Sequence, residues 1–470
     1  MTESAVAPNP LRGAAAPSSA GPVESLDPSL APPPLLPVSR NRQTLYFVWK
    51  PYKFQEWAKR ECGDVFRMRV IGRKEPFHIT SHPDHIKAIF LAKPDNAPSI
   101  TGDSPLRPIL GPGTVLTAIG QRHMRQRKLL LPSFHGDAIA AYTESIEQAI
   151  TKELDSWRAG STVELAPRMS AVTLDVIMAG VFGLDGEPTP GSPEDRVRKT
   201  LRRLLSISAK PWFPVVERRS LGHDSAQFPL NLVTDRGYAA IDRVIAARRA
   251  VPESERGADV MSLLMSATDE EGVPLSDYEL RMELLTLLLA GHETTANALA
   301  WLMERMVRTP EPYDALRDAV RAGGEESDAY IEAAINEGMR VRPVIPMVGR
   351  VAQSPWHFGE FAIEPGSPII ANIMGVHMRE DVYPDAKTLR PERFLGSAPG
   401  TYEWIPFGGG IRRCLGASLA MAEQRVVLRE MTRRVDMTFD KPEAEGARLR
   451  NVTLIPTRGG RVRLTRVSPA

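Results

Sequence analysis

The sequence is poor in cysteine and contains no long uninterrupted apolar run. Its 470 residues hold two cysteines, Cys62 and Cys414, whose separation suggests no disulfide framework and favours a reducing compartment. A membrane-spanning helix is not expected, because no stretch of about 18 apolar residues occurs. Basic and acidic residues nearly cancel to a net charge of +2, which excludes the strong basic bias of a nucleic-acid-binding chain.

Residues 1–38 lack the apolar periodicity of a folded segment and are rich in alanine, proline and serine. Such a composition buries too little apolar surface to offset the entropy of ordering, so we expect a flexible tail. The segment also lacks an unbroken apolar stretch after a basic start, which argues against secretion. We therefore expect one folded domain over residues 39–470 and a cytoplasmic location.

Cys414 lies in a glycine-rich loop that leads into a predicted helix. The stretch 407–416 reads FGGGIRRCLG, and the residues after it show an apolar helical face. Free amides at a helix start, together with Arg412 and Arg413, stabilise a thiolate. Glycine also lets the backbone approach a flat, bulky group without a Cβ in the way. A lone cysteine is more often a small buried apolar side chain, so both interpretations stay open at this point.

Residues 120–131 form a predicted basic helix. His123 and Arg127 are four positions apart and share one face, whereas a second face carries Arg122, Arg125 and Lys128. A solvated cationic surface is the ordinary interpretation of such a helix.

A long helix is predicted from Ser276, which forms a capping box with Glu279, to Arg308. Its apolar pattern is interrupted at residues 290–295 by AGHETT. Glycine within a helix costs about 1 kcal/mol relative to alanine, and threonine hydroxyls bonded to preceding carbonyls bend helices. Local physics alone therefore predicts a kink here.

Glu337 and Arg340 are three positions apart near the end of another predicted helix and share a face. On a surface such a pair contributes less than about 1 kcal/mol. Short alternating or apolar segments predict strands at 65–71, 77–80, 361–363, 368–371, 454–456 and 462–465. The predicted fold class is mainly α with a small β region.

Together these patterns resemble the cytochrome P450 family over residues 40–465. The loop 407–416 fits F-x-x-G-x-R-x-C-x-G, the family's haem-ligating loop, and AGHETT fits its oxygen-binding motif. Glu337 and Arg340 fit E-x-x-R, which is followed by P-E-R-F at 391–394. The resemblance implies a P450 fold, shaped like a triangular prism, with the long helix over the haem and the cysteine loop beneath it.

The resemblance implies haem b as the cofactor and Cys414 as the axial ligand of its iron. Thr294 and Glu293 would deliver protons during oxygen activation, with Ala290 and Gly291 leaving space above the iron. Further implied haem contacts are His123, Arg127 and Arg350 at the propionates, and Phe407, Gly408, Arg412 and Gly416 in the loop. Glu337, Arg340 and Arg393 would form a buried structural triad. The implied substrate pocket includes Ala290, Val344, Ile345, Met347, Leu106 and Leu110.

The implied activity is O2-dependent hydroxylation or epoxidation of a bulky hydrophobic molecule, such as a terpenoid, a fatty acid or a steroid-like compound. No reductase region follows in the chain, so electrons are expected from a ferredoxin and its reductase, docking near Arg125 and Arg413. We expect a monomer without stable membrane insertion. A peroxide-dependent peroxygenase and a non-catalytic haem sensor are the alternatives, and the Glu293–Thr294 pair argues against both.

Overall fold

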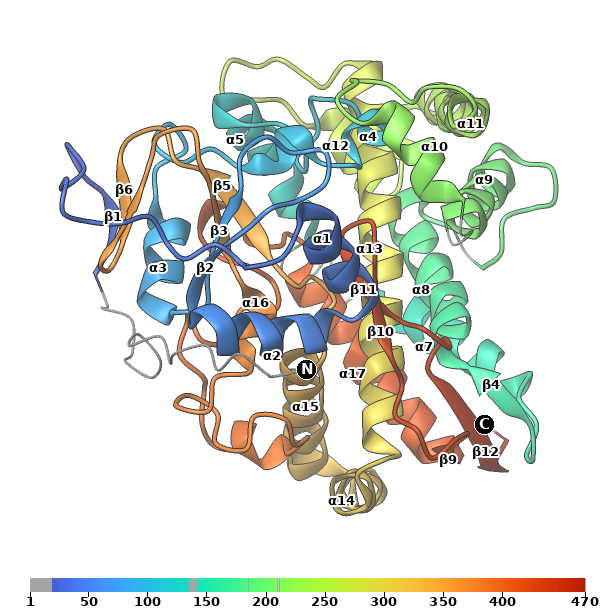
Figure 1. Cartoon of the computed structure of the whole chain (residues 1–470). Coiled ribbons are helices and arrows are strands. Elements are labelled where there is room, and N and C mark those ends of the chain that lie inside the picture. Colours follow the sequence, from blue (N-terminus) through green and yellow to red (C-terminus); the bar gives the residue numbers. More distant parts are fainter. Residues whose placement is uncertain (1–18, 135–141, 185, 209, 211, 470) are drawn as a thin grey trace.

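The computed structural model describes residues 19–134, 142–184, 186–208, 210 and 212–469 (Figure 1). Its helices are α1 (Arg40–Trp49), α2 (Pro51–Cys62), α3 (Pro83–Leu91), α4 (Arg107–Leu110), α5 (Gly120–Leu130), α7 (Tyr142–Asp155), α8 (Leu165–Phe182), α9 (Pro193–Ser208), α10 (Phe213–Ser220), α11 (Asn231–Arg249), α12 (Val260–Ser266), α13 (Asp277–Met306), α14 (Pro310–Ala322), α15 (Gly324–Val341), α16 (Ile373–His377) and α17 (Ala417–Arg434). Its strands are β1 (Ala20–Pro22), β2 (Val65–Met68), β3 (Phe77–Thr80), β4 (Thr162–Glu164), β5 (Val348–Val351), β6 (Trp356–Phe358), β7 (Phe361–Ile363), β8 (Pro368–Ala371), β9 (Val435–Phe439), β10 (Ala447–Arg450), β11 (Thr453–Pro456) and β12 (Arg461–Val467).

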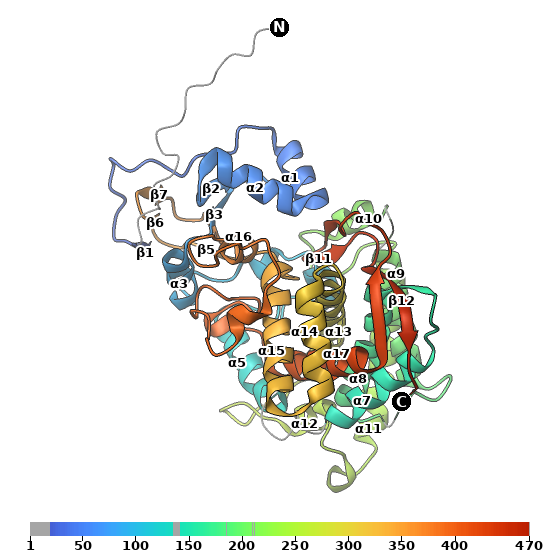
Figure 2. The same ribbon diagram turned by 90° about the horizontal axis from the view of Figure 1, so that it is seen from below.

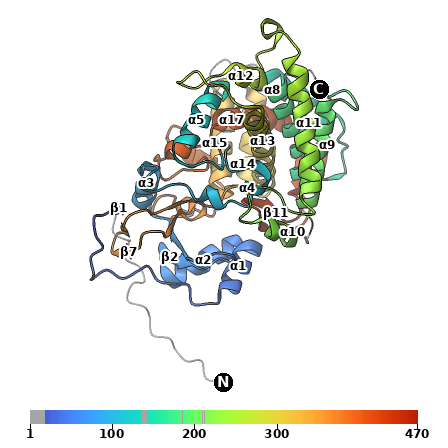
Figure 3. The ribbon, with the colours of Figure 1, turned by 90° about the horizontal axis from the view of Figure 1, so that it is seen from above.

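Helix α13 is the central element, and Figure 3 looks nearly along it and shows other helices around it. The predicted capping box is present, because the Ser276 hydroxyl accepts from the Glu279 amide and the Glu279 carboxylate accepts from the Ser276 amide. Leu284 and Leu288 are fully buried, and the helix packs along α8. The prediction of a long central helix is confirmed.

The β region consists of small sheets at the margins of the helical core (Figures 1 and 2). The largest has the order β2-β3-β8-β5, in which β3 and β8 are parallel and the other pairs are antiparallel. This sheet matters for the site, because Arg350 extends from β5, opposite Ile369 of β8. The fold is mainly α with a small β region, as predicted.

Residues 19–38 do not behave as the predicted tail. Strand β1 pairs antiparallel with β6, and Leu36 is 2% exposed in an apolar cluster with Phe47 and Phe54. The buried Gln43 amide also donates to the Leu36 carbonyl. Pairing with a distant strand gives the backbone amides and carbonyls of this segment hydrogen-bond partners, which the composition of the segment could not reveal. Residues 1–18 lie outside the described residues.

The segment between α9 and α11 contains a helix that the sequence did not predict. Helix α10 begins at Phe213 with Pro214 in its first turn. Proline is tolerated there, because the first amides of a helix have no partner within the helix. The prolines therefore mark a helix start rather than a simple break.

Among the described residues, α8 has the length and apolarity of a membrane-crossing helix. More than half of it is buried inside the protein, where it packs against α13. Burial in the core accounts for its apolar composition.

Candidate functional site

The cysteine loop is a tight turn that places Cys414 just before α17. Gly408 and Gly410 have φ values of +66° and +62°, a region that favours glycine. A Cβ on Gly410 would also overlap the carbonyl of Phe90 in α3. The Cys414 amide donates to the Phe407 carbonyl at 3.0 Å and closes the turn.

The surroundings of Cys414 do not stabilise a thiolate by themselves. Solvent reaches this residue on one side, while protein surrounds most of the thiol and desolvates it. Desolvation raises the pKa of Cys414, although the Gly416 amide and the charges of Arg413 and Arg127 act in the opposite direction. A thiolate here therefore needs a further positive charge, which a bound metal ion supplies.

Three arginines and one histidine lie together beside this loop and come from three elements. His123 and Arg127 come from α5, Arg350 from β5 and Arg412 from the loop. Burial and the charges of Arg412, Arg127 and Arg350 lower the pKa of His123 to about 3. Burial also lowers the pKa values of Arg350 and Arg412 to about 10.

Within the described part of the chain, the three arginines donate to backbone carbonyls, and none of them pairs with a carboxylate. Arg127 donates to the Arg413 carbonyl at 2.8 Å, and Arg350 to its neighbour Gly349 at 3.0 Å. Arg412 donates to the carbonyls of Val115, Leu116 and Ala118. Partly buried cations without counter-charges form a site suited to an anionic ligand.

The interrupted part of α13 is accessible in the middle of the helix. Ala290 is exposed and Thr294, one turn later, is half-buried, whereas Leu288 and Thr295 are buried. The Thr294 hydroxyl donates to the Ala290 carbonyl at 2.7 Å. Apart from the exposed first turn, this is the exposed patch of the helix, and it marks where a ligand would contact α13.

Two details of this helix differ from the sequence-based expectation. Gly291 was expected to leave space above an iron, but a Cβ on it would lie 3.0 Å from the Ile177 side chain. Its lack of a side chain therefore allows close packing of α8 on α13. Glu293 is ion-paired with Arg450 of β10 at 2.6 Å and accepts from Thr453 at 3.1 Å. The carboxylate is thus tethered away from the helix axis.

The structure brings Glu337, Arg340 and Arg393 into one buried network. The side chains of Glu337 and Arg340 are both 0% exposed. The Arg340 guanidinium donates to the two carboxylate oxygens of Glu337 at 2.7 and 2.8 Å. Arg393 lies 3.4 Å from the same carboxylate. Arg340 also donates to the His377 carbonyl, and the His377 ring accepts from the Ile405 amide, just before the cysteine loop. The network therefore connects α15 to that loop.

The proposed substrate residues pack against three different apolar clusters of the described structure. Leu110 is buried in the main apolar cluster, and Leu106 and Val344 pack against that cluster. Ile345 packs in the cluster around α3 and β8, and Met347 in the cluster of α1, α2 and the largest sheet. Local sequence position does not reveal which apolar cluster a side chain joins.

The sequence matches the family model described as "Cytochrome P450" over residues 30–462. The chain is 33% identical over 440 residues to a putative cytochrome P450 135B1 of Mycobacterium bovis, with 93% of this chain and 92% of the relative covered. It is 36% identical over 410 residues to a putative cytochrome P450 137 of Mycobacterium tuberculosis, with 86% and 83% covered. The chain belongs to the cytochrome P450 family.

The same fold is present in the retinoic acid-bound cyanobacterial CYP120A1, with a TM-score of 0.76, 22% identity, and coverage of 93% of this chain and 100% of the other. A P450 heme domain described as cytochrome P450DA gives a TM-score of 0.77 at 20% identity, with 94% and 99% covered. The protein is a haem-thiolate P450 monooxygenase, which uses O2 and a redox partner. The cations Arg127, Arg350 and Arg412, which pair with no described acid, together with the neutral imidazole of His123 as a hydrogen-bond donor, fit the two carboxylates of haem. The thiol of Cys414 fits the haem iron.

Replacing Arg350 by methionine is expected to affect the haem-free and haem-bound P450 in opposite directions. The haem-free variant should be more stable, because a buried guanidinium without a counter-charge is removed. Haem affinity should fall about 10- to 100-fold, the equivalent of one charged hydrogen bond of about 1.5–3 kcal/mol. Haem titration and thermal unfolding measure the two effects. Arg60→Met, at an exposed position, is the control, and unchanged haem affinity would contradict the assignment.

Two buried acids of this P450 were not identified from the sequence. Glu283, within the apolar stretch of α13, accepts from the Val115 amide at 2.7 Å, and its second oxygen is unpartnered among the described residues. Glu423 of α17 is buried, and desolvation raises its pKa despite a hydrogen bond with Thr295. A lone acid among leucines was a usable signal for Glu283. Glu423 lies in an ordinary amphipathic pattern, so the sequence offered no signal that it is buried.

Glu283 makes the stability of the fold depend on pH. Burial away from water is the main reason why the pKa of Glu283 rises from 4.5 to about 8 in the folded P450. The free energy of unfolding is highest, as far as Glu283 is concerned, below pH 4.5, where both states are protonated. It falls as pH rises towards about 8, because the folded state then retains a proton that the unfolded state has released. Glu283→Gln still accepts from Val115 but cannot ionise. Urea unfolding from pH 4.5 to 8 should therefore show a flatter pH dependence for the variant, and parallel curves would contradict this.

Proposed function

We propose that this P450 inserts one oxygen atom of O2 into a bulky apolar molecule, by hydroxylation or epoxidation. A terpenoid, a fatty acid or a steroid-like compound are the substrate classes that we propose. The observation that carries this proposal is the accessible patch at Ala290 and Thr294 in the middle of α13, where an alcohol and the neighbouring acid Glu293 occur on a mostly buried stretch of the helix.

Haem, when bound, supplies the oxygen chemistry. In our proposal Cys414 binds its iron, and His123, Arg127, Arg350 and Arg412 bind its propionates. The glycines of the cysteine loop keep the backbone close, as the positive φ of Gly408 and Gly410 requires. The Glu337–Arg340–Arg393 network holds the loop through His377 and Ile405.

Proton delivery is the proposed task of Thr294 and Glu293. The Thr294 hydroxyl donates to the Ala290 carbonyl at the accessible face of α13. By rotating away from that carbonyl it could instead donate to an ordered water beside the haem that this face would contact. Glu293 is tethered by Arg450 and Thr453, so it must rotate away from Arg450 to carry a proton towards Thr294. General acid–base groups of this kind contribute about 10²- to 10⁴-fold to rates.

Thr294→Ala is the test of this role. The variant should retain haem and substrate binding, while product formation falls about 100-fold and the electrons supplied appear as hydrogen peroxide. Product and peroxide are both measured per NADPH consumed with a ferredoxin and its reductase. Thr286→Ala is a matched control, because its hydroxyl also donates to a carbonyl four residues earlier on α13, at 2.7 Å, but is buried.

Normal coupling in Thr294→Ala would contradict the proton-delivery role. Turnover with hydrogen peroxide alone, and not with O2 and a reductase system, would favour the peroxygenase alternative. Haem binding without any turnover would favour the sensor. We further propose a cytoplasmic monomer that receives electrons from a small acidic ferredoxin at the face formed by α5 and the cysteine loop.

A further inference from the structure

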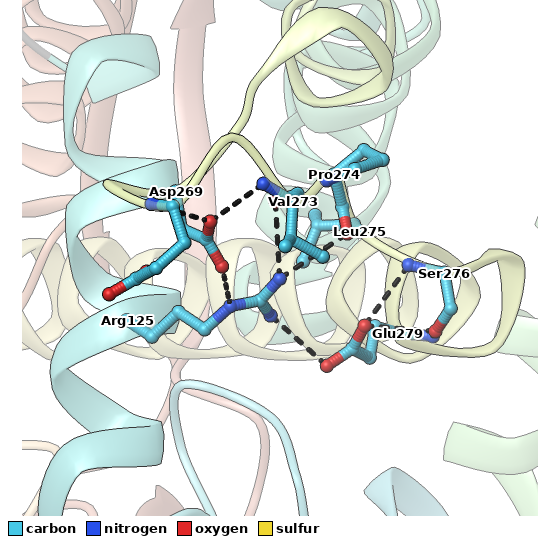
Figure 4. A pocket seen from close by; sticks show the side chains of 8 residues that line it. Arg125, Asp269, Val273, Pro274, Leu275, Ser276 and Glu279 are labelled. Atoms are coloured by element: carbon cyan, nitrogen blue, oxygen red, sulfur yellow. Dashed lines mark hydrogen bonds and ion pairs between the residues drawn. The ribbon is translucent and has the colours of Figure 1, made fainter.

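Arg125, one of the outward cations of α5, is already paired with acids of the same chain (Figure 4). The Arg125 guanidinium lies 2.6 Å from Asp269 and 3.2 Å from Glu279. It also donates to the carbonyls of Val273 and Pro274 at 3.4 and 3.3 Å. Arg125 was expected to face an acidic redox partner, but the segment between α12 and α13 occupies its donors.

The same segment reaches the other outward cations. Lys128 lies 2.6 Å from Glu270, with both side chains largely exposed, and Arg122 lies 3.9 Å from Glu279. Glu270 and Glu271 both raise the pKa of Lys128. Each outward cation of α5 therefore faces at least one carboxylate of residues 269–279. These cations need no external partner to balance their charge.

The acidic turn, residues 269–271, is held in shape by its own hydrogen bonds. The Asp269 carboxylate accepts from the amides of Glu271 at 3.2 Å and Val273 at 2.8 Å, and the Gly272 amide donates to the Asp269 carbonyl. A hollow of about 500 Å³ separates this segment from α5 and is lined by Arg125, Glu271, Leu275 and Glu279 among others. An ordered turn beside an open hollow can be displaced without disturbing the core.

The inner cations of this face are different. Arg127 and Arg413 flank Cys414 and, among the described residues, neither forms an ion pair with an acid; Arg127 donates only to the Arg413 carbonyl. Arg127 is a proposed ligand of a haem propionate, so Arg413 is the cation next to Cys414 that remains for an external partner, whereas positive charge further out on α5 is neutralised by the chain itself.

We propose that the acidic turn is a built-in competitor for the acidic electron donor. This inference rests on the proposed ferredoxin partner. The turn occupies Arg125 and Lys128, and its three carboxylates repel an approaching acidic protein, which slows the encounter. The donor reaches Arg413 fully only when Glu270 and Glu271 move away from α5.

The double variant Glu270→Gln, Glu271→Gln tests the proposal, because both side chains are exposed and their replacement leaves Asp269 to form the turn. An acidic [2Fe–2S] ferredoxin, kept reduced by its reductase, should reduce the holoenzyme about tenfold faster in the variant at low ionic strength. The rate is read from the appearance of the reduced carbon monoxide complex. The difference should vanish in high salt, where screening removes long-range forces.

The matched control is Glu325→Gln, Glu326→Gln, which changes the net charge equally at the exposed start of α15. It should leave the rate unchanged within about twofold. Equal or lower rates in the turn variant at low salt would overturn the inference, while the proposed donor would stand if the wild type is reduced. If the ferredoxin reduces neither protein, the proposed donor fails, and the inference fails with it.

Discussion

Cys414→Ser is expected to abolish substrate oxidation without unfolding the protein. The protein itself raises the pKa of Cys414 rather than lowering it, so the thiolate depends on the metal, and a serine hydroxyl is a far weaker donor to iron. The reduced carbon monoxide complex should lose the long-wavelength absorption of thiolate-ligated haem. Turnover measured with the redox partners should fall to background.

Cys62→Ser is the matched control for this experiment. Desolvation, together with the nearby Glu61, raises the pKa of the half-buried Cys62 thiol to about 11, so it is a poor nucleophile and a poor ligand. The control should keep both the spectrum and the turnover. A Cys414→Ser protein that still oxidises substrate, or a wild type that binds no haem, would contradict the proposed iron ligand.

Glu337→Ala is expected to destabilise the fold by about 3–5 kcal/mol, because it leaves the fully buried Arg340 without its counter-charge. Arg393 loses its ion pair with the same carboxylate, and the backbone amide of Arg390 loses its hydrogen-bond acceptor. The change is measured as the free energy of unfolding in urea. Haem retention should fall as well, since the network reaches the cysteine loop through His377 and Ile405.

Glu332→Ala provides the comparison on the same helix. Its carboxylate pairs with Arg425 at 2.9 Å, and both side chains are exposed, so the loss should be at most about 1 kcal/mol. Equal losses in the two variants would show that burial does not strengthen the Glu337 pair. The ordinary surface interpretation of E-x-x-R would then hold.

Elements with strong local signals were predicted well. Helix α2 begins at Pro51 and ends at Cys62, where the local signals are clear, because proline starts it and Gly63, with φ +80°, ends it. The capping box at Ser276 located the start of α13. The strands at 77–80, 361–363 and 368–371 are β3, β7 and β8. In each case the information lies within a few neighbouring residues.

Interactions between distant segments were not predictable in this way. Arg450, which holds Glu293, lies 157 residues away in the sequence. The position of Gly291 became interpretable only from its contact with Ile177 of α8. The acidic turn pairs with a basic helix more than 140 residues earlier, whereas the ordinary interpretation of that helix was a solvated cationic surface.

The sequence by itself determined the family, the cysteine loop and the motif on α13, because each is a short pattern whose spacing carries the chemistry. Only the tertiary structure decided which charges are free. Arg125 and Glu293 are neutralised by distant partners, while Arg127 and Arg413 are not paired with any described acid. The reason is that an ion pair depends on distances of a few ångströms, which folding sets between residues far apart in the chain.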